Sequence, residues 1–399
     1  MKKLTLLFAA LMVSVTVFAQ TCVDDAWQCL RQNQAPKAKK FIEECLAANP
    51  DNAQVWLMRG NVYINLYNTD QKKMKADPNY TPRYPDALQI ANESFVKALS
   101  LDPKVQPKSG MLGAIDGQKL CAEPFYDLGN SYLKKGDYQK ALDNFLVAAK
   151  NYELAKSSNA SLAYYSAAAI YKENLKDNDN AKKMFAKSVS ANPNFIYGII
   201  ELYYMYMDDK DTVNCGKMID KMLAVPAEKL PKDVKSGVYE AQMSYYSLLN
   251  DEAKLMATCD SALAFDSSEE MVARCANYLS NYKAFQKAED IIKNALAANP
   301  GSYKLNEQMG YLFYERMHAI EDQVAALQKE KKWNEAIALK GSPELKEMTE
   351  KAHEWCQKAY NIDADHLDNN KRLRELKVKL QLEVPQELND KINARMHQN

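Results

Sequence analysis

The chain has 399 residues, of which 52 are Lys or Arg and 52 are Asp or Glu, so its formal charge is zero. A balanced charge gives no general attraction to nucleic acid or to an anionic membrane, and neither is expected as a partner. Hydrophobic residues make up 47% of the chain, while Gly (12) and Pro (14) are scarce. This composition suits long helices joined by short turns and excludes low-complexity disorder.

The first residues have the parts of a secretory signal peptide. Met1-Lys2-Lys3 is a short positive segment, and an uncharged apolar run from Leu4 to Phe18 follows it. We expect residues 1–19 to be removed, and the mature chain to be exported to the periplasm or the outer membrane, or to be secreted. The run is short for a membrane span, so we do not expect an integral membrane protein. An uncleaved anchor and a lipid on Cys22 stay open as alternatives.

A helix stop recurs along the rest of the chain. Proline cannot continue a helix and pushes the preceding residue out of helical geometry. Four prolines each follow an amphipathic run, namely Pro50, Pro103, Pro193 and Pro300. A glycine stands ten residues beyond the first and the last of them, at Gly60 and Gly310. This fixed offset indicates a structural repeat.

The clearest repeat unit has small residues where two helices must approach closely and large residues between them. Its marks are Phe125, Leu128, Gly129 and Tyr132 on a first helix, and Ala141, Phe145 and Ala148 on a second. The pattern resembles the tetratricopeptide repeat, a helix-turn-helix unit of about 34 residues. The resemblance implies an all-α solenoid of helical hairpins wound into a right-handed superhelix.

Other units carry the same marks, so the resemblance covers most of residues 20–382. Better-defined units contain Trp56, Tyr164, Val272 and Gly310, and degenerate ones fill about 22–50, 196–228 and 236–268. Together they predict about eight hairpins. The unit with Tyr164 has one extra residue between its two helices. A charged amphipathic helix from Leu367 to Leu380 is expected to cap the last apolar face, before a tail at 383–399.

Three segments depart from the repeat pattern. An insertion at about 66–84 is rich in turn residues, and we expect a loop there. A second insertion, at about 316–345, has a helical composition and is expected to lengthen two helices into a projecting hairpin. The stretch 104–121 contains Gly110, Gly113 and Gly117, whose spacing matches no phosphate-binding loop, and it is predicted to be an irregular connector.

Eight cysteines occur, at 22, 29, 45, 121, 215, 259, 275 and 356, with no CxxC motif among them. Several fall at repeat positions where a small apolar residue packs between helices, as a buried free thiol can. Disulfides remain open for an exported chain. If bridges form, Cys29 with Cys45 is the first candidate, because both lie on one predicted hairpin. Cys259 with Cys275, on successive helices, is the second.

No set of residues for catalysis can be assembled. The chain has no serine elbow, no HExxH motif, no Walker loop and no Cys/His pair with a third orienting group. His353 and Cys356 share one helix face, but two ligands do not make a structural zinc site. We therefore expect no enzyme, no metal and no cofactor.

Tyrosine is in excess, with 24 residues against 11 Phe and 4 Trp. The resemblance implies that the first helix of each repeat lines a groove for partners. The residues of this chain at those positions are Leu57, Asn61, Tyr126, Asn130, Tyr165, Tyr197, Tyr204, Asn277, Tyr311 and Tyr314. Tyr and Asn together suit a peptide backbone, although Tyr is also a core residue of this repeat. Leu57 and Tyr126 stand where domains that clamp chaperone C-termini carry Lys, so that clamp is not expected.

The function expected from these features is an exported scaffold for protein–protein interactions in the periplasm or cell envelope, within an envelope assembly or secretion complex. Its partners would be other envelope proteins or peptides, with peripheral association to a membrane complex. The alternative is a glycan-binding module of the cell surface. Repeat solenoids offer extended surfaces rather than catalytic pockets, which favours the scaffold.

Overall fold

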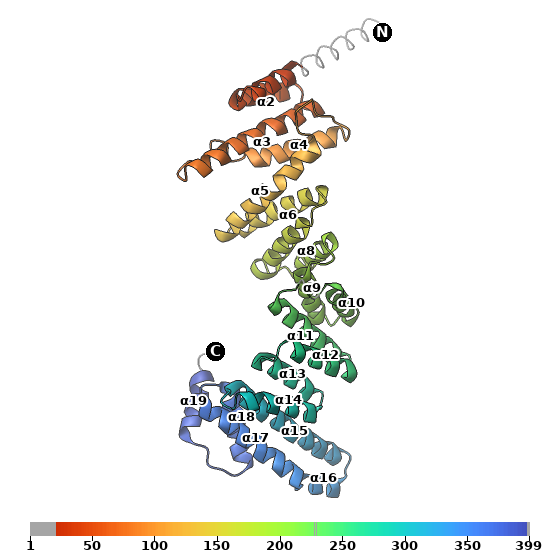
Figure 1. The fold of residues 1–399 in the computed structure, drawn as a ribbon, viewed down its shortest axis with the longest axis vertical. Helices are drawn as coiled ribbons and strands as arrows, with labels where there is room; N and C mark the ends of the chain where they lie inside the picture. The colour runs from red at the N-terminus through yellow and green to blue at the C-terminus, as the bar shows by residue number, and fades with distance from the viewer. Residues whose placement is uncertain (1–20, 227, 229, 397–399) are drawn as a thin grey trace. The chain divides into compact units, whose positions relative to one another are not determined.

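The computed structural model describes residues 21–396 except 227 and 229, and every regular element in that part of the chain is a helix (Figure 1). The all-α class predicted from the sequence is therefore confirmed. The predicted signal peptide, residues 1–19, lies outside the described residues. None of the described helices is both long and apolar enough to cross a membrane. The chain divides into two units, Met1–Met205 and Tyr206–Asn399, which we describe separately.

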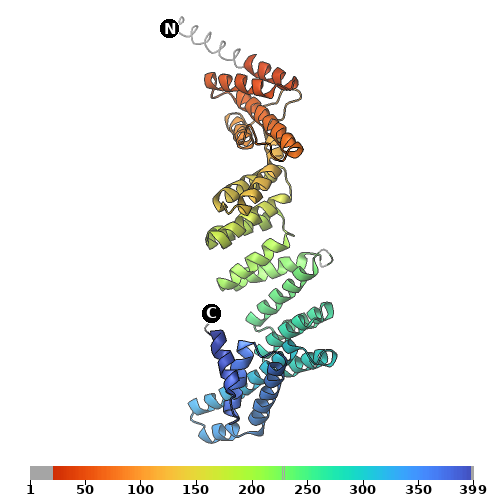
Figure 2. The same ribbon diagram turned by 90° about the vertical axis from the view of Figure 1, so that its left-hand side faces the viewer.

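The first unit is a succession of helix pairs. It contains a helix at 21–31, α2 (Ala35–Ala48), α3 (Ala53–Ala76), α4 (Ala87–Leu101), α5 (Ala114–Lys134), α6 (Tyr138–Leu154), α7 (Asn159–Ala169), the π-helical segment η1 (Ile170–Asn174), α8 (Asn178–Ala191) and most of α9 (Ile196–Asp208). The two helices of each pair α3–α4, α5–α6 and α7–α8 pack against each other, and Figure 2 shows them side by side.

The second unit continues the pairs and ends in a cap. Its helices are α10 (Thr212–Ala224), α11 (Lys232–Leu248), α12 (Glu252–Phe265), α13 (Glu269–Asn281), α14 (Phe285–Ala298), α15 (Tyr303–Lys329), α16 (Trp333–Lys340), α17 (Pro343–Ile362), α18 (Leu367–Lys379) and α19 (Gln386–Met396). Along the described chain the helices follow one another in eight consecutive pairs, as predicted. Helix α18 packs on α17 and buries Leu373 and Leu376, so the predicted cap is confirmed.

Glycines on first helices make room for large side chains of second helices. The Phe95 ring of α4 lies between α3 and α5, where a Cβ added to Gly60 would lie 2.5 Å from the ring and one added to Gly117 would lie 2.4 Å from it. Gly129 and Phe145 repeat this contact in the next pair, with a distance of 2.7 Å. The small-and-large pattern in the sequence therefore reflects close contact between helices.

The loop predicted for residues 66–84 is wrong in its first half. Helix α3 continues to Ala76, and only the residues between it and α4 are non-helical. Leu66 and Asp70 are buried on this extension. The Asp70 carboxylate accepts hydrogen bonds from the Tyr80 hydroxyl (2.7 Å) and the Tyr84 amide (2.8 Å), which hold the returning segment against the helix. These tertiary contacts outweigh the turn-forming composition.

The irregular connector predicted for residues 104–121 is too long. Helix α5 begins at Ala114, so Gly117 and Cys121 are helical. Gly117 costs helix stability, but its missing side chain admits the Phe95 ring. The packing thus explains why a glycine-containing segment is a helix here.

The insertion at 316–345 lengthens both helices of the last pair, as predicted. Helix α15 runs to Lys329 and α17 begins at Pro343, and the short helix α16 lies between them. The tail at 383–399 differs from the prediction, because α19 folds there and buries Leu388 and Ile392.

The extra residue of the fourth pair is absorbed by a wider helical turn. In η1 the Leu175 amide donates to the Ile170 carbonyl oxygen (3.0 Å), five residues back, which is the π-helical pattern. The turn that follows contains Lys176 in the left-handed region, with φ of 57°. Similar left-handed residues occur in the turns of other pairs, at Asn33, Gly136, Lys210, Asn250 and Lys283.

One disulfide is present among the described residues, and it is not the one first predicted. Cys45 pairs with Cys22, with a Cα–Cα distance of 6.0 Å, while Cys29 is a buried free thiol. Cys22 and Cys29 are seven residues apart on one helix, so both lie on the same face and helical periodicity could not separate them. Cys259 and Cys275 are also free and buried, with their Sγ atoms 3.5 and 3.8 Å from Met243 Sδ.

Candidate peptide-binding surface

Leu57 and Asn61, two of the ten predicted groove residues, are buried within the chain. Leu57 is fully buried, so it is a core residue and its predicted contact with a partner is wrong. Asn61 is 6% exposed. Its Nδ2 donates to the Leu112 carbonyl oxygen (3.0 Å), and its Oδ1 accepts from the Leu112 amide (2.8 Å). The side chain of Asn61 therefore pairs with both backbone groups of Leu112, a residue of the connector between α4 and α5.

The next pair presents the same arrangement without an occupant. Asn130 of α5 follows Gly129 as Asn61 follows Gly60, and each glycine packs on a phenylalanine of the paired helix. The Asn130 side chain is half-buried and has no hydrogen-bond partner among the described residues. Tyr126 lies one helical turn before it. The side-chain amide of Asn130 on α5 is therefore available to the backbone of a partner, whereas that of Asn61 on α3 is already bonded to Leu112.

Tyrosines from three successive first helices accompany Asn130. The Tyr126 ring packs on Phe145 (5.2 Å between centroids), and its hydroxyl lies 3.4 Å from Ser166 Oγ on α7. Tyr165 of α7 lies 6.4 Å from the ring of Tyr197 of α9. We name Tyr126, Asn130, Tyr165, Ser166 and Tyr197 the tyrosine surface.

The tyrosines of this surface differ in how much they contribute to packing. Tyr165 also makes edge contacts with Phe185 (5.4 Å) and Phe195 (5.6 Å), and burial raises its pKa. Tyr197 is 46% exposed. Beside them an ion pair joins Lys172 of η1 to Glu201 of α9 (2.7 Å). The surface therefore combines a packed aromatic base, an exposed ring and a charged edge, and it contains no arrangement of groups for bond making or breaking.

The remaining predicted residues are not part of this surface. Tyr204 is 40% exposed, on the later part of α9, and Asn277 is exposed on α13. Tyr311 and Tyr314 of α15 are half-buried at the cap. The Arg372 guanidinium lies 5.2 Å from the centre of the Tyr311 ring, and the Tyr314 hydroxyl donates to Glu375 (2.6 Å). The cap helix therefore covers the last two tyrosines, and burial raises the pKa of both.

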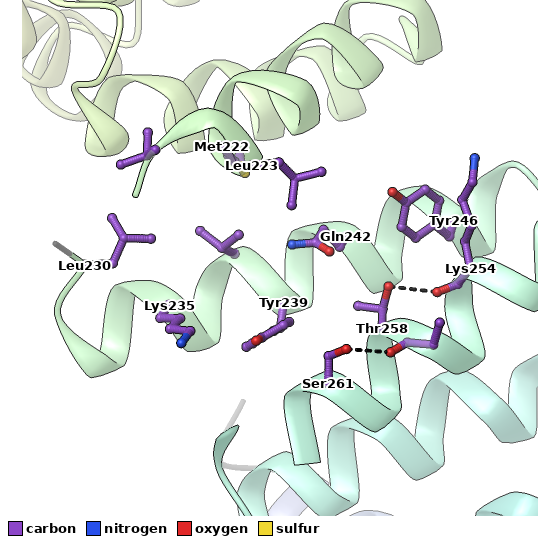
Figure 3. Close-up of a pocket in the computed structure, with 13 residues that line it drawn as sticks. Met222, Leu223, Leu230, Lys235, Tyr239, Gln242, Tyr246, Lys254, Thr258 and Ser261 are labelled. Carbon is purple, nitrogen blue, oxygen red and sulfur yellow. Dashed lines mark hydrogen bonds between the residues drawn. The ribbon is translucent and has the colours of Figure 1, made fainter. Parts of the chain in front are cut away.

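A pocket of about 390 Å³ in the second unit was not expected from the sequence (Figure 3). It lies between α10, α11 and α12. Leu223 and Leu230 contribute apolar side chains, and Lys235 lies at its edge with Nζ 4.1 Å from the centre of the Phe265 ring. The one sequence signal for it is the helix break at Val225-Pro226, shortly after Leu223.

The polar groups of this pocket do not provide a catalytic set. The hydroxyls of Thr258 and Ser261 donate to backbone carbonyl oxygens of their own helix, at 2.7 and 2.9 Å (Figure 3). Such bonds satisfy the hydroxyl donors locally. Gln242 is 8% exposed. The pocket can therefore admit an apolar side chain between two second helices, on elements other than those of the tyrosine surface.

Comparison with known proteins identifies the repeat. Residues 162–195 match the family model described as tetratricopeptide repeat, which spans α7, η1 and α8. No curated protein sequence is significantly similar to the chain. Residues 162–195 are therefore similar to a tetratricopeptide repeat, and the helices before and after them follow one another in pairs of the same kind.

Several solved structures are similar over much of the chain. They include pilF of Pseudomonas aeruginosa (14% identity, 69% of this chain and 99% of that chain, TM-score 0.31). A tetratricopeptide repeat protein from Parabacteroides merdae has 13% identity over 79% of this chain and 98% of that chain, with a TM-score of 0.36. At these TM-scores the similarities say nothing about the function of this chain.

Proposed function

We propose that this protein is an exported scaffold that binds extended segments of other proteins through the tyrosine surface, in the periplasm or at the cell envelope. The observation that carries the proposal is the pairing of Asn61 with both backbone groups of Leu112. It demonstrates, within this chain, how an asparagine at that place on a first helix holds both backbone groups of a residue from another segment.

Asn130 can repeat this pairing for a partner. It occupies the equivalent place on α5, and its amide can both donate and accept. Tyr126 and Tyr197 offer aromatic rings with a hydroxyl at the rim, which suits peptide groups next to apolar side chains. In most interfaces a few strong contacts of this kind provide most of the binding free energy.

Two features support the proposed location. The first 19 residues have the composition of a signal peptide. The disulfide between Cys22 and Cys45 fits an oxidising compartment, where such bonds persist. Membership of an envelope assembly or secretion complex remains part of the proposal, with other envelope proteins or peptides as partners.

A photocrosslinking amino acid at position 197 tests the proposal. The variant chain is expressed with its signal segment, irradiated in cells, and purified from the envelope fraction. The matched control carries the same group at Tyr138, which is 38% exposed on the second helix α6. We expect discrete crosslinked products from position 197, and their loss by about tenfold or more when Asn130→Ala is added, as removal of an anchor of about 1.4 kcal/mol or more predicts.

Equal crosslinking from positions 197 and 138 would contradict the proposed surface. A mature chain recovered only in the cytoplasm would contradict the proposed location. We do not propose the glycan-binding alternative, because the observation that carries the proposal is the pairing of an asparagine with the two groups of a peptide backbone, which does not favour a sugar.

A further inference from the structure

The segment between α4 and α5 lies on the first helices of the two opening pairs. We define residues 104–113 as the strap. We infer that the face of α3 and the helix at 21–31 is a second peptide site, whose partner is a segment with a basic residue, a glycine two positions later in a turn, and then two apolar residues. The strap is the resident occupant that such a partner displaces. The inference rests on the proposed function, because it assumes that the chain binds protein segments.

The strap is held by its backbone. Besides the two bonds between Asn61 and Leu112, the Gln54 side chain donates to the Gln106 carbonyl oxygen (2.9 Å). The two side chains that bind the strap backbone, Gln54 and Asn61, both belong to α3. Backbone pairing of this kind does not depend on the identity of the bound side chains, so a foreign segment can use it equally well.

Three side-chain contacts of the strap define the expected sequence pattern of the partner. Lys108 forms an ion pair with Asp24 on the helix at 21–31. A turn returns from Lys108 to Met111, whose amide donates to the Lys108 carbonyl oxygen (2.9 Å). Gly110 in this turn has φ of +85°, and a Cβ there would lie 3.2 Å from the Trp27 ring. The positive φ therefore favours glycine, and a side chain at this position would require the Trp27 ring to shift.

The apolar end of the strap fills the surface next to this turn. Met111 is 8% exposed and packs within the core of the first unit, and Leu112 is half-buried against the same core. Lys108, Gly110, Met111 and Leu112 together give the pattern. Partial burial also lowers the pKa of Lys108, in keeping with a lysine that lies against the surface and not in bulk water.

The site is larger than its occupant. Asn61, Asn65 and Asn68 lie on one face of α3 at steps of four and three residues. The strap pairs with the first of these amides only. A cavity of about 260 Å³ beside Gly110 is lined by the exposed Asn65, Asn68 and Arg31. A longer foreign segment can therefore make contacts that the strap does not make.

Displacement of the strap requires that a partner make contacts that the strap does not make. A tethered segment competes at an effective concentration on the order of millimolar. A partner replaces it only if it binds the site better than the strap by enough to offset that concentration. The two unused amides and Arg31 supply additional groups for such a partner.

A peptide in solution tests the site. The probe is a fluorescent peptide with the sequence of residues 104–113. The strap-weakened variant is the full chain with Lys108→Ser and Met111→Ser, which removes the ion pair and the buried side chain. We expect the probe to bind this variant at least about tenfold more tightly than it binds the unchanged chain. Adding Asn61→Ala should reduce the binding again by about tenfold.

Two matched controls define the specificity. A probe with valine in place of its glycine should not bind, because a β-branched residue disfavours positive φ. Gln139→Ala, which removes an exposed amide on α6, should leave binding to the strap-weakened variant unchanged. Equal binding with and without Asn61→Ala, equal binding to the weakened and unchanged chains, or no binding at all would each overturn the inference.

Hydrogen exchange provides a measurement that does not depend on a variant. In the unchanged chain the Leu112 amide is bonded to Asn61 and should exchange slowly. The probe, distinguished by isotopic labelling, is added well above the effective concentration of the tethered strap, which is on the order of millimolar. It should then accelerate exchange at that amide, and unchanged exchange would overturn the inference even if the strap-weakened variant did not fold. Crosslinking from position 197 does not involve the strap. If the peptide-binding experiments fail, the proposed function still stands. If the crosslinking fails, the strap site is judged by peptide binding alone.

Discussion

Phe95 shows how single residues determine the spacing of helices in this chain. Its ring lies between two first helices, and each helix contributes a glycine at the point of contact. A methyl group at Gly117 would lie 2.4 Å from the ring, and the ring itself is fully buried. Neither partner can move without displacing other core side chains, because protein interiors are close-packed.

We therefore expect Gly117→Ala to destabilise the chain by about 1–3 kcal/mol, because the gain in helix propensity is smaller than the cost of overpacking. Urea unfolding followed by circular dichroism measures the change. Gly237→Ala is the matched control, because Gly237 lies within α11 and a Cβ there meets nothing within 4 Å. That change should stabilise the chain by roughly 0.5–1 kcal/mol. Equal effects of the two substitutions would show that close contact is not the reason for Gly117.

The site residues differ in how far the sequence could predict them. The register placed Asn61, Asn130 and Tyr197 on first-helix faces, and the structure has them on α3, α5 and α9. Burial of Leu57 and occupation of Asn61 by Leu112 could not be predicted, because they depend on where the connector returns, about fifty residues later in the chain. Helical periodicity predicts which residues share a face of the helix, but it does not predict which segment covers that face.

At the scale of secondary structure, aspartates cap the N-termini of several second helices. Four of them accept a hydrogen bond from the amide three residues later, namely Asp137 before α6, Asp177 before α8, Asp211 before α10 and Asp251 before α12. Such caps stabilise a helix and favour the ionised carboxylate. Hydrogen bonds from Lys140, Asn180 and Lys254 lower the pKa values of Asp137, Asp177 and Asp251.

This lowering predicts a dependence of stability on pH. The contribution is fully present above the pKa of Asp in the unfolded chain, about 3.9, and is lost as the pH falls through the lower folded values. Changing all three aspartates to asparagine keeps the caps but removes the titration. The melting temperature of this variant should fall less steeply between about pH 5 and pH 2 than that of the unchanged chain.

Asp290→Asn serves as the control for that comparison, because Asp290 accepts from Gln286 within α14 and caps no helix. It should leave the pH profile of the melting temperature unchanged. A triple variant with the same steepness as the original chain would show that the caps are not the source of the acid sensitivity.

Elements were predictable where their signals are local. Proline stops and paired small and large residues identified the helix pairs, and one surplus residue between Tyr171 and Ala181 marked the site of η1. Its π-helical form was not predictable, since a longer turn would have absorbed the residue as well. The helical extension of α3 was missed for a related reason. Asp70 stabilises it through hydrogen bonds from Tyr80 and Tyr84, which lie 10 and 14 residues later in the chain, beyond the reach of local helix propensity.

At the scale of the whole chain, each of the two units is stabilised by contacts between its own neighbouring helix pairs, and the last pair of the second unit needs a cover. Helix α18 supplies it through buried Leu373 and Leu376 and through polar contacts with α15, including Arg372 with Glu307 (3.1 Å). Repeat arrays without a polar terminal cap expose an apolar face and tend to associate.

Ending the chain after Asp363 should therefore produce soluble aggregates or oligomers, detectable by size-exclusion chromatography with light scattering. The contacts of Tyr311 and Tyr314 with Arg372 and Glu375 are lost with the same deletion. A chain that ends at Met396 retains every described helix and should elute as the full-length protein does. Identical elution of both shortened chains would contradict the role of α18 as a cap.

The left-handed turn residues have a kinetic consequence. Lysine or asparagine occupies this conformation in most of the turns described above, at a cost of roughly 1–2 kcal/mol relative to glycine. A turn that is unfavourable by itself is a poor nucleus for a hairpin. We therefore expect the two helices to associate before the turn is fixed in place. Because the partners are adjacent in sequence, this search is short, and each pair is expected to form rapidly as a local folding event.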